Sequence, residues 1–464
     1  MEDLTSGPIT RHLLKTTGFM LVMMIFQTLY FLVDLYWVGR LGTAAVAGVG
    51  VAGNLTFIVL GISQMLGVGT TAVVSHAAGR KDRPEAQHLF NQSQVLSIVT
   101  AFAFLVVGLG ARVPYTQAMS ADADTARLAG DYLLWFIPAM ALQFPLGTMG
   151  AALRATGNFK PGMLVSTVTV TINMIIAPFL IFGWGTGHAF GVQGAAMSSL
   201  IAIVIGIVWL SRYFVAKDAF LHYAFHDWRP QLAQWRRMLG IGLPTGVEFA
   251  MMAAYSFLVY TLSRPFGAAA QAGFGIGGRV IQAGFMPVVA LGFAVAPVAG
   301  QNFGARLAPR VKATFKDAAL LAAGVMLAFA LLCEVAAAGM VHGFSKDPAV
   351  IAVGAEYLRI IAWGFICSGI IFVTSSMFQA MGNTVPSLVA SAIRITLVAI
   401  PAIALSRLPN FQLIWIWYLS VVTILIQMTI SLMLLRREYK RRLDFGVVAP
   451  PVGIGAPEGA PAGT

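Results

Sequence analysis

The stretch "LRATGNFKPG" at residues 153–162 has a counterpart in "FQAMGNTVPS" at residues 378–387, one offset of 225 positions away. Both stretches follow an apolar run and share a Gly-Asn pair with a proline three residues later. A repeat at one fixed offset is typical of a duplicated architecture. The same offset relates Leu41-Gly42 to Phe266-Gly267, Gly79 to Gly304, Pro84 to Pro309, Asp131 to Glu356, Gly157-Asn158 to Gly382-Asn383 and Pro161 to Pro386. The sequence therefore predicts two similar halves.

The composition predicts an all-α polytopic membrane protein. Of the 464 residues, 58% are hydrophobic and 10% are charged, and the mean hydropathy is +0.80, which is too apolar for a water-soluble globule. Twelve apolar runs are long enough to cross about 30 Å of hydrocarbon. The expected transmembrane helices are 13–37, 46–72, 91–112, 128–150, 161–182, 192–214, 239–262, 271–297, 316–340, 351–377, 386–406 and 412–435.

Six helices in each half return the chain to the side where it started, so the halves should be parallel repeats. We expect two pseudo-symmetric six-helix lobes, residues 1–211 and 239–442, facing each other across a central cleft. The linker 212–238 is amphipathic and basic, which fits either a segment on the inner leaflet or a simple tether. The Pro, Gly and Ala-rich tail 443–464 is expected to be disordered.

The charge distribution predicts orientation rather than nucleic-acid binding. The formal net charge is +12, but the basic residues are spread over many loops instead of one domain. With the N-terminus placed in the cytoplasm, 21 of the 30 Lys and Arg residues fall on the inner side and six on the outer side. The positive-inside rule thus places both termini in the cytoplasm of a plasma (inner) membrane protein.

Several motifs resemble the multidrug and toxic compound extrusion (MATE) family. They are "FGIGGRVIQAGFMPVVALGFAVAPVAGQNFGAR" at 274–306, its weaker counterpart "VVSHAAGRKDRPEA" at 73–86, and the paired stretches quoted above. The resemblance covers the chain apart from the tail. It implies a twelve-helix secondary exporter that expels organic and often cationic compounds in exchange for protons or sodium ions. We expect the protein to act as a monomer. No further cofactor is implied.

One carboxylate in the first span is a candidate for ion coupling. Gln27, Tyr30 and Asp34 are spaced at i, i+3 and i+7, so one helix face carries all three. A carboxylate in hydrocarbon costs on the order of 3 kcal/mol, which favours a functional reason for Asp34. Burial favours the protonated acid and an approaching cation favours the carboxylate, so proton, sodium and cationic substrate would compete there. The alternative is an interfacial Asp34 paired with Arg40.

The resemblance adds a partner for this acid. Asn173 matches a family asparagine in the fifth span, and Asp34 with Asn173 is a possible sodium site. Many members carry a second acid one turn later, where this chain has Ala177. That departure weakens the case for two carboxylates in the N-terminal lobe, and Asn173 as a helix-packing amide remains an alternative.

Glu248 is the corresponding candidate in the C-terminal lobe. It follows Pro244 by four residues, where proline can open a helix. Arg279 and Gln282, in "GGRVIQAG", are expected on the same cation-coupling and substrate-binding surface, and Arg279 could neutralise Glu248. A second acid found in other members is replaced by Ser368. The alternative is a structural pairing of Glu248 with Arg279 or Arg394.

Two other functions compete with export. A flippase for lipid-linked sugars shares the architecture, although it would favour more basic cleft residues and additional spans. A membrane-embedded enzyme would need a metal cluster or a nucleophile with its base, and neither pattern occurs in the sequence. The expected partners are small-molecule substrates and the surrounding lipid bilayer, and the chain is not expected to be an enzyme.

Overall fold

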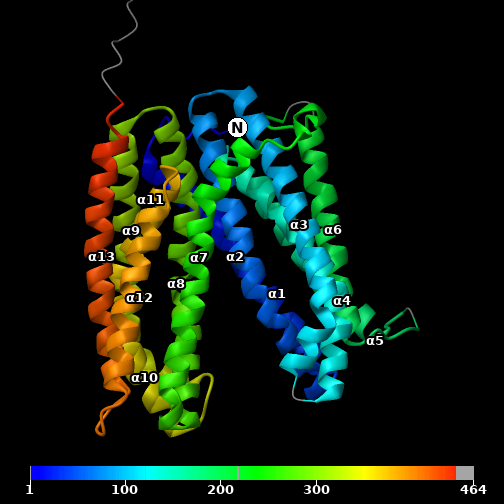
Figure 1. Cartoon of the computed structure of the whole chain (residues 1–464), viewed down its shortest axis with the longest axis vertical. Helices are drawn as coiled ribbons and strands as arrows, with labels where there is room; N and C mark the ends of the chain where they lie inside the picture. Colours follow the sequence, from blue (N-terminus) through cyan, green and yellow to red (C-terminus); the bar gives the residue numbers. More distant parts are fainter. Residues whose placement is uncertain (1, 121, 186, 217–218, 446–464) are drawn as a thin grey trace, which may run out of the picture.

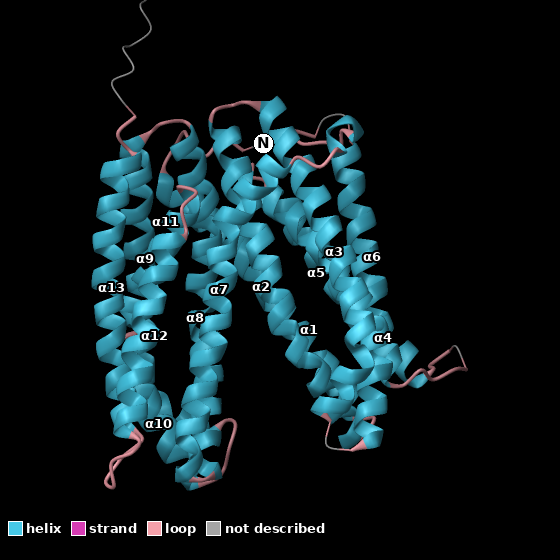
Figure 2. Ribbon diagram, in the orientation of Figure 1, coloured by secondary structure: helices cyan, strands magenta, loops and turns pink. Residues whose placement is uncertain are grey.

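The computed structural model describes residues 2–120, 122–185, 187–216 and 219–445, so the predicted disorder of the tail falls almost entirely outside the described residues. Helices form all the regular structure of these ranges, which contain no strand (Figure 2). The elements are α1 Ile9–Gly39, α2 Thr43–Gly79, α3 Arg83–Met119, α4 Ala123–Ala155, α5 Phe159–Phe182, α6 Val192–Val215, η1 Phe225–Trp228, α7 Leu232–Ser263, η2 Arg264–Phe266, α8 Ala268–Gly304, α9 Ala308–His342, α10 Pro348–Ala362, α11 Phe365–Ala380, α12 Val385–Leu405 and α13 Ile414–Arg442.

Eleven of the described helices are long and apolar enough to cross a membrane, and α10 with α11 forms a twelfth, broken span. The predicted all-α polytopic membrane protein is confirmed. The prediction of one continuous helix over 351–377 is wrong, because α10 and α11 meet at 60°. The break falls at Trp363 and Gly364, between the two helices. Glycine is frequent in membrane helices, so Gly364 alone did not signal a break.

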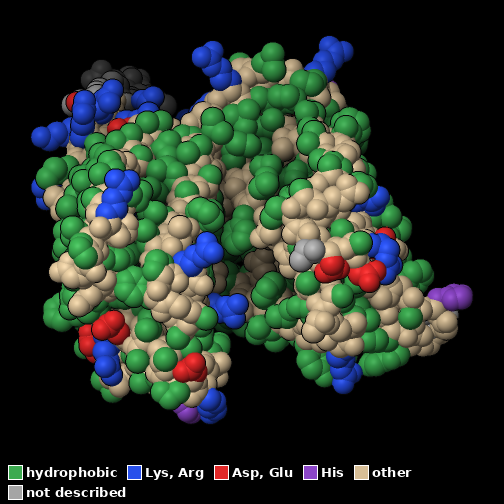
Figure 3. Space-filling view, turned by 60° about the horizontal axis from the view of Figure 1, so that its bottom comes forward, with side chains coloured by type: hydrophobic (Ala, Val, Ile, Leu, Met, Phe, Trp, Pro, Cys, Tyr) green, Lys and Arg blue, Asp and Glu red, His purple; other side chains and the backbone are tan. Residues whose placement is uncertain are grey.

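The helices form two bundles, α1–α6 and α7–α13 (Figure 1). The bundles converge at the end of the molecule that holds the N-terminus and the end of α13, called here the terminal face, and separate toward the opposite end. A space-filling view from that opposite end shows a hollow between the bundles (Figure 3). This arrangement agrees with the predicted two lobes around a central cleft, with the cleft closed at the terminal face.

The backbone follows the repeat offset found in the sequence. Lys81 and Arg306 have left-handed φ values of 59° and 61°, although neither is a glycine. Such φ values are uncommon outside glycine, so finding them at equivalent positions is strong support for a common helix-ending turn. Gly157 and Gly382 show the same agreement, with φ values of 77° and 70°.

Glycines bring the two lobes into backbone contact at a surface that we call the seam. It joins α2 of the N-terminal lobe to α7 and α8 of the C-terminal lobe. A Cβ atom on Gly79 would lie 2.0 Å from the carbonyl oxygen of Gln301, and one on Gly304 would lie 2.2 Å from that of His76. Glycine has no side chain, so the backbones of two membrane helices can approach this closely where they meet at glycines. The seam thus closes the cleft at the terminal face.

Two equivalent side chains also bridge the seam. The Nε2 group of His76 donates to the carbonyl oxygen of Ala380 at 2.6 Å, and the Nε2 group of Gln301 donates to that of Ala155 at 2.8 Å. The repeat offset relates His76 to Gln301 and Ala155 to Ala380. Each lobe therefore donates one buried hydrogen bond to the same position of the other lobe.

The N-terminal segment, residues 2–8, crosses the seam at the terminal face. The Glu2 amide donates to Thr156 of the N-terminal lobe at 3.0 Å, and the Leu4 amide donates to Gln301 of the C-terminal lobe at 3.1 Å. The Leu4 side chain is completely buried in the C-terminal core. A hydrogen bond from Thr5 lowers the pKa of Asp3, so its carboxylate remains charged opposite Lys81 as the pH falls below neutral. The segment therefore ties the two lobes together.

Replacing Leu4 by alanine should loosen this tie. Removing a fully buried leucine side chain costs roughly 2–5 kcal/mol, which here weakens the attachment of the N-terminal segment to the C-terminal lobe. We expect faster hydrogen–deuterium exchange in peptides covering residues 2–8 and 295–305. Leu14→Ala is the matched control, because Leu14 is 56% exposed. Equal exchange in both variants would show that the N-terminal segment does not hold the seam.

The linker docks on the protein through its own backbone. Arg83 donates to the carbonyl oxygens of Ala219 and Phe220, and the Gln92 amide donates to that of Arg229 at 2.9 Å. Polar side chains of α3 thus donate hydrogen bonds to backbone carbonyl oxygens of the irregular linker. In its described part, the linker is better described as a docked segment than as a free tether.

Candidate cation and substrate site

The predicted N-terminal site lies among α1, α5 and α6. The Tyr30 hydroxyl and Ser199 Oγ form a hydrogen bond of 2.8 Å, and the Asn173 amide donates to Ser199 Oγ at 3.2 Å. The Asn173 side chain is buried. The structure therefore joins Tyr30 and Asn173, which lie four helices apart along the chain, through one serine hydroxyl.

Asp34 lies one helical turn after Tyr30 on α1. Its Oδ1 atom is buried and has no hydrogen-bond partner in the described part of the chain. Leaving a buried polar group unpaired costs about 1–3 kcal/mol, and more when it is charged. A proton or another cation would remove that cost.

The pairing of Asp34 with Arg40 is not found. The guanidinium of Arg40 lies 5.3 Å from the ring centre of Tyr36 and 5.7 Å from that of Trp37. Among the described residues, neither Asp34 nor Arg40 takes part in an ion pair. Cation–π contacts hold Arg40 near the end of α1 instead.

Gln27 does not join this site, although the i, i+7 spacing placed it on the face of Asp34. Its side chain is exposed and has no partner in the described residues. Farther toward the start of the same helix, Met20 packs with Ala290 of the other lobe. The start of α1 therefore packs against the C-terminal lobe, and its end packs within the N-terminal lobe. Residues on one face of α1 thus have different surroundings at the two ends of the helix.

The site contains one carboxylate. Ala177, one turn after Asn173, is buried and apolar, as the sequence indicates. No group of three or more His, Cys, Asp or Glu side chains suitable for a metal occurs in the described ranges. One carboxylate with neutral oxygen atoms around it suits a monovalent cation better than a divalent metal, which needs more charge and more ligands.

Glu248 occupies a polar layer of the C-terminal lobe formed by α7, α12 and α13. Its Oε1 atom accepts from Ser391 Oγ at 3.3 Å, and Ser391 accepts from the Gln427 amide at 3.2 Å. Glu248 forms no ion pair in the described chain, so the alternative, a structural pairing with Arg279 or Arg394, is not found. Serine and glutamine therefore solvate this carboxyl in place of an arginine.

The two remaining predicted residues are not brought to Glu248. Arg279 and Gln282 are exposed on α8 and have no hydrogen-bond partner among the described residues. They share the helix face of Gly275, where a Cβ atom would meet the Tyr260 hydroxyl of α7 at 2.7 Å. Arg279 and Gln282 thus lie at exposed positions beside α7, whereas Glu248 is half-buried among α7, α12 and α13.

Each lobe contains a tyrosine–serine hydrogen bond that was not predicted from the sequence. The Tyr255 hydroxyl bonds to Ser420 Oγ at 2.9 Å, just as Tyr30 bonds to Ser199, and the repeat offset relates the two tyrosines. The guanidinium of Arg394 lies 5.4 Å from the ring centre of Tyr255. The offset alone could have indicated the equivalence of Tyr30 and Tyr255.

The acids, in contrast, are not equivalent. The position that matches Asp34 by the offset is Val259, and the position that matches Glu248 is Met23. Glu248 precedes Val259 by roughly three helical turns, which corresponds to about 16 Å along a helix. The two lobes thus hold their carboxyl groups at different depths.

Known proteins support this assignment of architecture. The sequence profile of the MatE family matches residues 20–179 and 244–405. The chain is 25% identical to a FAD transporter of Shewanella oneidensis over 87% of its own length and 89% of that protein. It is 24% identical to the multidrug export protein MepA of Staphylococcus haemolyticus, covering 78% of this chain and 80% of MepA.

Solved structures show the same fold. A MOP superfamily transporter from Pyrococcus furiosus, described as having a binding pocket of reverse polarity, superposes with a TM-score of 0.87 at 22% identity, covering 94% of this chain and 97% of that one. The Vibrio cholerae MATE transporter VcmN superposes with a TM-score of 0.86 at 23% identity, covering 94% and 99%. The two matched segments of the profile fall in the two lobes and contain Asp34, Asn173 and Glu248. The chain is therefore a member of the MatE family of multi-pass membrane transporters, and not an enzyme.

Proposed function

We propose that this protein is a secondary active exporter in the plasma membrane, with both termini in the cytoplasm. It exchanges protons or sodium ions for organic, often cationic, small molecules by alternating access between its two lobes. The observation that carries the proposal is the buried, unpaired Oδ1 atom of Asp34 on α1, a helix that packs against both lobes. A cation bound there would bias the lobe arrangement, because a ligand favours whichever conformation binds it more tightly.

The coupling sites in this proposal are Asp34 with Tyr30 and Asn173 in one lobe and Glu248 in the other. The oxygen atoms around Asp34 suit either a proton or a sodium ion. Arg279 and Gln282, which are exposed on α8, contact the substrate instead. The protein works as a monomer, because the two lobes of one chain already form the cleft.

Flavin nucleotides are a second candidate cargo. The Shewanella oneidensis relative is named a FAD transporter, and FAD carries a negatively charged diphosphate. Arg279 and Arg394 lie in membrane-spanning helices and form no ion pair in the described chain. Unpaired guanidinium groups suit phosphate oxygens, with which arginine forms bidentate contacts.

The test is transport by the purified full-length protein in proteoliposomes, with pH and sodium gradients imposed separately. A cationic dye and FAD serve as the two cargoes. We expect one of the gradients to drive at least one cargo above the level of protein-free liposomes. If neither gradient drives either cargo, export of these compounds is wrong, and movement of lipid-linked sugars becomes the leading alternative.

A further inference from the structure

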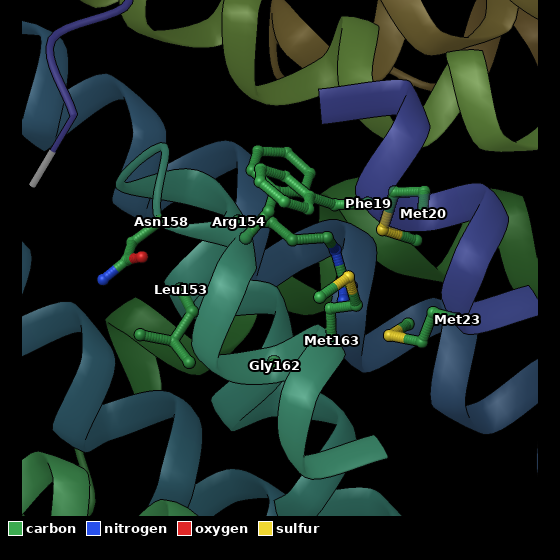
Figure 4. Close-up of a pocket in the computed structure, with 10 residues that line it drawn as sticks. Phe19, Met20, Met23, Leu153, Arg154, Asn158, Gly162 and Met163 are labelled. Atoms are coloured by element: carbon green, nitrogen blue, oxygen red, sulfur yellow. The ribbon is translucent and has the colours of Figure 1, made fainter. Parts of the chain in front are cut away.

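A small pocket beside the seam contains one arginine and no acid. Its cavity measures about 10 Å³, room for a single water-sized occupant. The wall comes from α1, α4 and α5 and consists mainly of methionine, phenylalanine and glycine. Figure 4 shows the Arg154 side chain running from α4 toward Met163 and α1, whereas Asn158 points the other way.

Arg154 has no counterion in this pocket. In the described part of the chain, no carboxylate lies within ion-pair distance of its guanidinium, and no carbonyl or hydroxyl accepts a hydrogen bond from it. Its one contact with a charged or aromatic group is the ring of Phe293, whose centre is 5.6 Å away. The Asn158 side chain points away from Arg154, and its amide nitrogen donates to the Tyr213 hydroxyl at 2.7 Å.

An arginine in such a place calls for an anion. The guanidinium stays protonated in proteins, so it cannot become neutral as a buried acid can. Arg154 is half-buried, and a charge held against apolar walls is stabilised when an opposite charge binds beside it. A cation–π contact lowers that cost but leaves the five N–H donors of the guanidinium without acceptors.

We infer that the pocket at Arg154 binds one small monatomic anion, chloride under cellular conditions. The small enclosed space favours a monatomic anion over a carboxylate or phosphate group. Chloride is larger than a water molecule, so the wall has to widen to admit it. Methionine side chains are flexible and polarizable, so Met20, Met23 and Met163 can adjust around such an ion. The inference does not depend on which compound the protein exports.

The anion would also link the site to the conformation. The pocket lining comes from the N-terminal lobe, but Phe293, which contacts Arg154, belongs to α8 of the C-terminal lobe. Met20, which lines the pocket, packs with Ala290 of the same α8. The site is therefore complete only while the lobes meet on this side, and chloride should stabilise the form with the seam closed.

The experiment measures thermal unfolding of the purified full-length protein in sodium chloride, sodium bromide and sodium gluconate at equal ionic strength. We expect the unfolding temperature to rise and saturate with chloride and bromide but not with gluconate. Arg154→Met should abolish this rise, because methionine fills similar space without charge. Arg83→Met is the matched control, since Arg83 also lies over an aromatic ring, at 5.8 Å from Phe220, yet donates to backbone carbonyls. The control should keep the chloride response.

Bromide also gives a direct measurement on the unaltered protein. Crystals grown in sodium bromide should show an anomalous peak beside Arg154. Absence of that peak, or equal unfolding temperatures in chloride and gluconate, would show that the pocket holds water and would overturn the proposal. Stabilisation by anionic lipid but not by halide would overturn it as well. If Arg154→Met fails to fold, Arg154→Lys and the bromide crystals still provide the test.

Discussion

Asp34→Asn is expected to reduce gradient-driven export to the level of protein-free liposomes while leaving the amount of protein in the membrane unchanged. Asparagine has nearly the same size as aspartate but cannot gain or lose a proton and offers a sodium ion no negative charge. The Oδ1 atom of Asp34 is buried without a partner in the described chain, so the wild-type carboxyl depends on a bound cation more than a hydrogen-bonded acid would. The neutral asparagine does not need a bound cation, so the variant no longer couples ion movement to export.

The measurement is dye efflux from proteoliposomes under the gradient that drives the wild type. Glu334→Gln is the matched control, because Glu334 is also an acid in a membrane-spanning helix but is exposed on α9. We expect the control to transport normally. Normal coupling by Asp34→Asn at a normal protein level would remove Asp34 from the mechanism and leave Glu248 as the remaining candidate.

Gly242→Ala is expected to prevent closure of the seam. A Cβ atom on Gly242 of α7 would lie 1.9 Å from the carbonyl oxygen of Met65 on α2, and backbone atoms cannot move aside as a side chain can. Overpacking a close contact costs roughly 1–3 kcal/mol or more, which is enough to shift a balanced equilibrium between two lobe arrangements. We expect transport to fall sharply while each lobe remains folded.

Hydrogen–deuterium exchange of peptides covering residues 61–79 measures this opening. Gly240→Ala is the matched control, since it lies two residues away on α7 and a Cβ atom there meets nothing within 4 Å. Faster exchange in Gly242→Ala than in Gly240→Ala would confirm the role of the contact. Slow exchange and full transport in both variants would mean that the backbone at Gly242 accommodates a Cβ atom and that this contact does not control closure of the seam.

Much of the fold could be predicted because hydrophobic length and the repeat offset are properties of the sequence itself. Each span is set by the thickness of hydrocarbon, and the repeat is readable from landmarks such as Gly157 and Gly382. The seam could not be predicted in this way. The chain has 48 glycines, and only the structure shows that Gly242 of one lobe faces Met65 of the other.

The candidate site was predicted less completely than the fold. Helical spacing placed Tyr30 and Asp34 in one region, but the same spacing also added Gln27, which is exposed. The alternative pairing of Glu248 with an arginine is not found, and the sequence could not decide it because residue charges alone do not give the distance between two side chains. Ser391 and Ser199, which provide the polar contacts, carry no signal in a sequence where serines are common in helices.

The equivalent bonds from His76 to Ala380 and from Gln301 to Ala155 have the form of a twofold homodimer interface, in which position i of one partner contacts position j of the other and the reverse. A six-helix ancestor could have paired with a second copy of itself through this surface before duplication joined the copies. Histidine and glutamine now occupy the position that such an ancestor would have filled with one residue type. In a single chain the two halves can carry different residues at equivalent positions, as they do with His76 and Gln301, and with Asp34 and Glu248 at different depths.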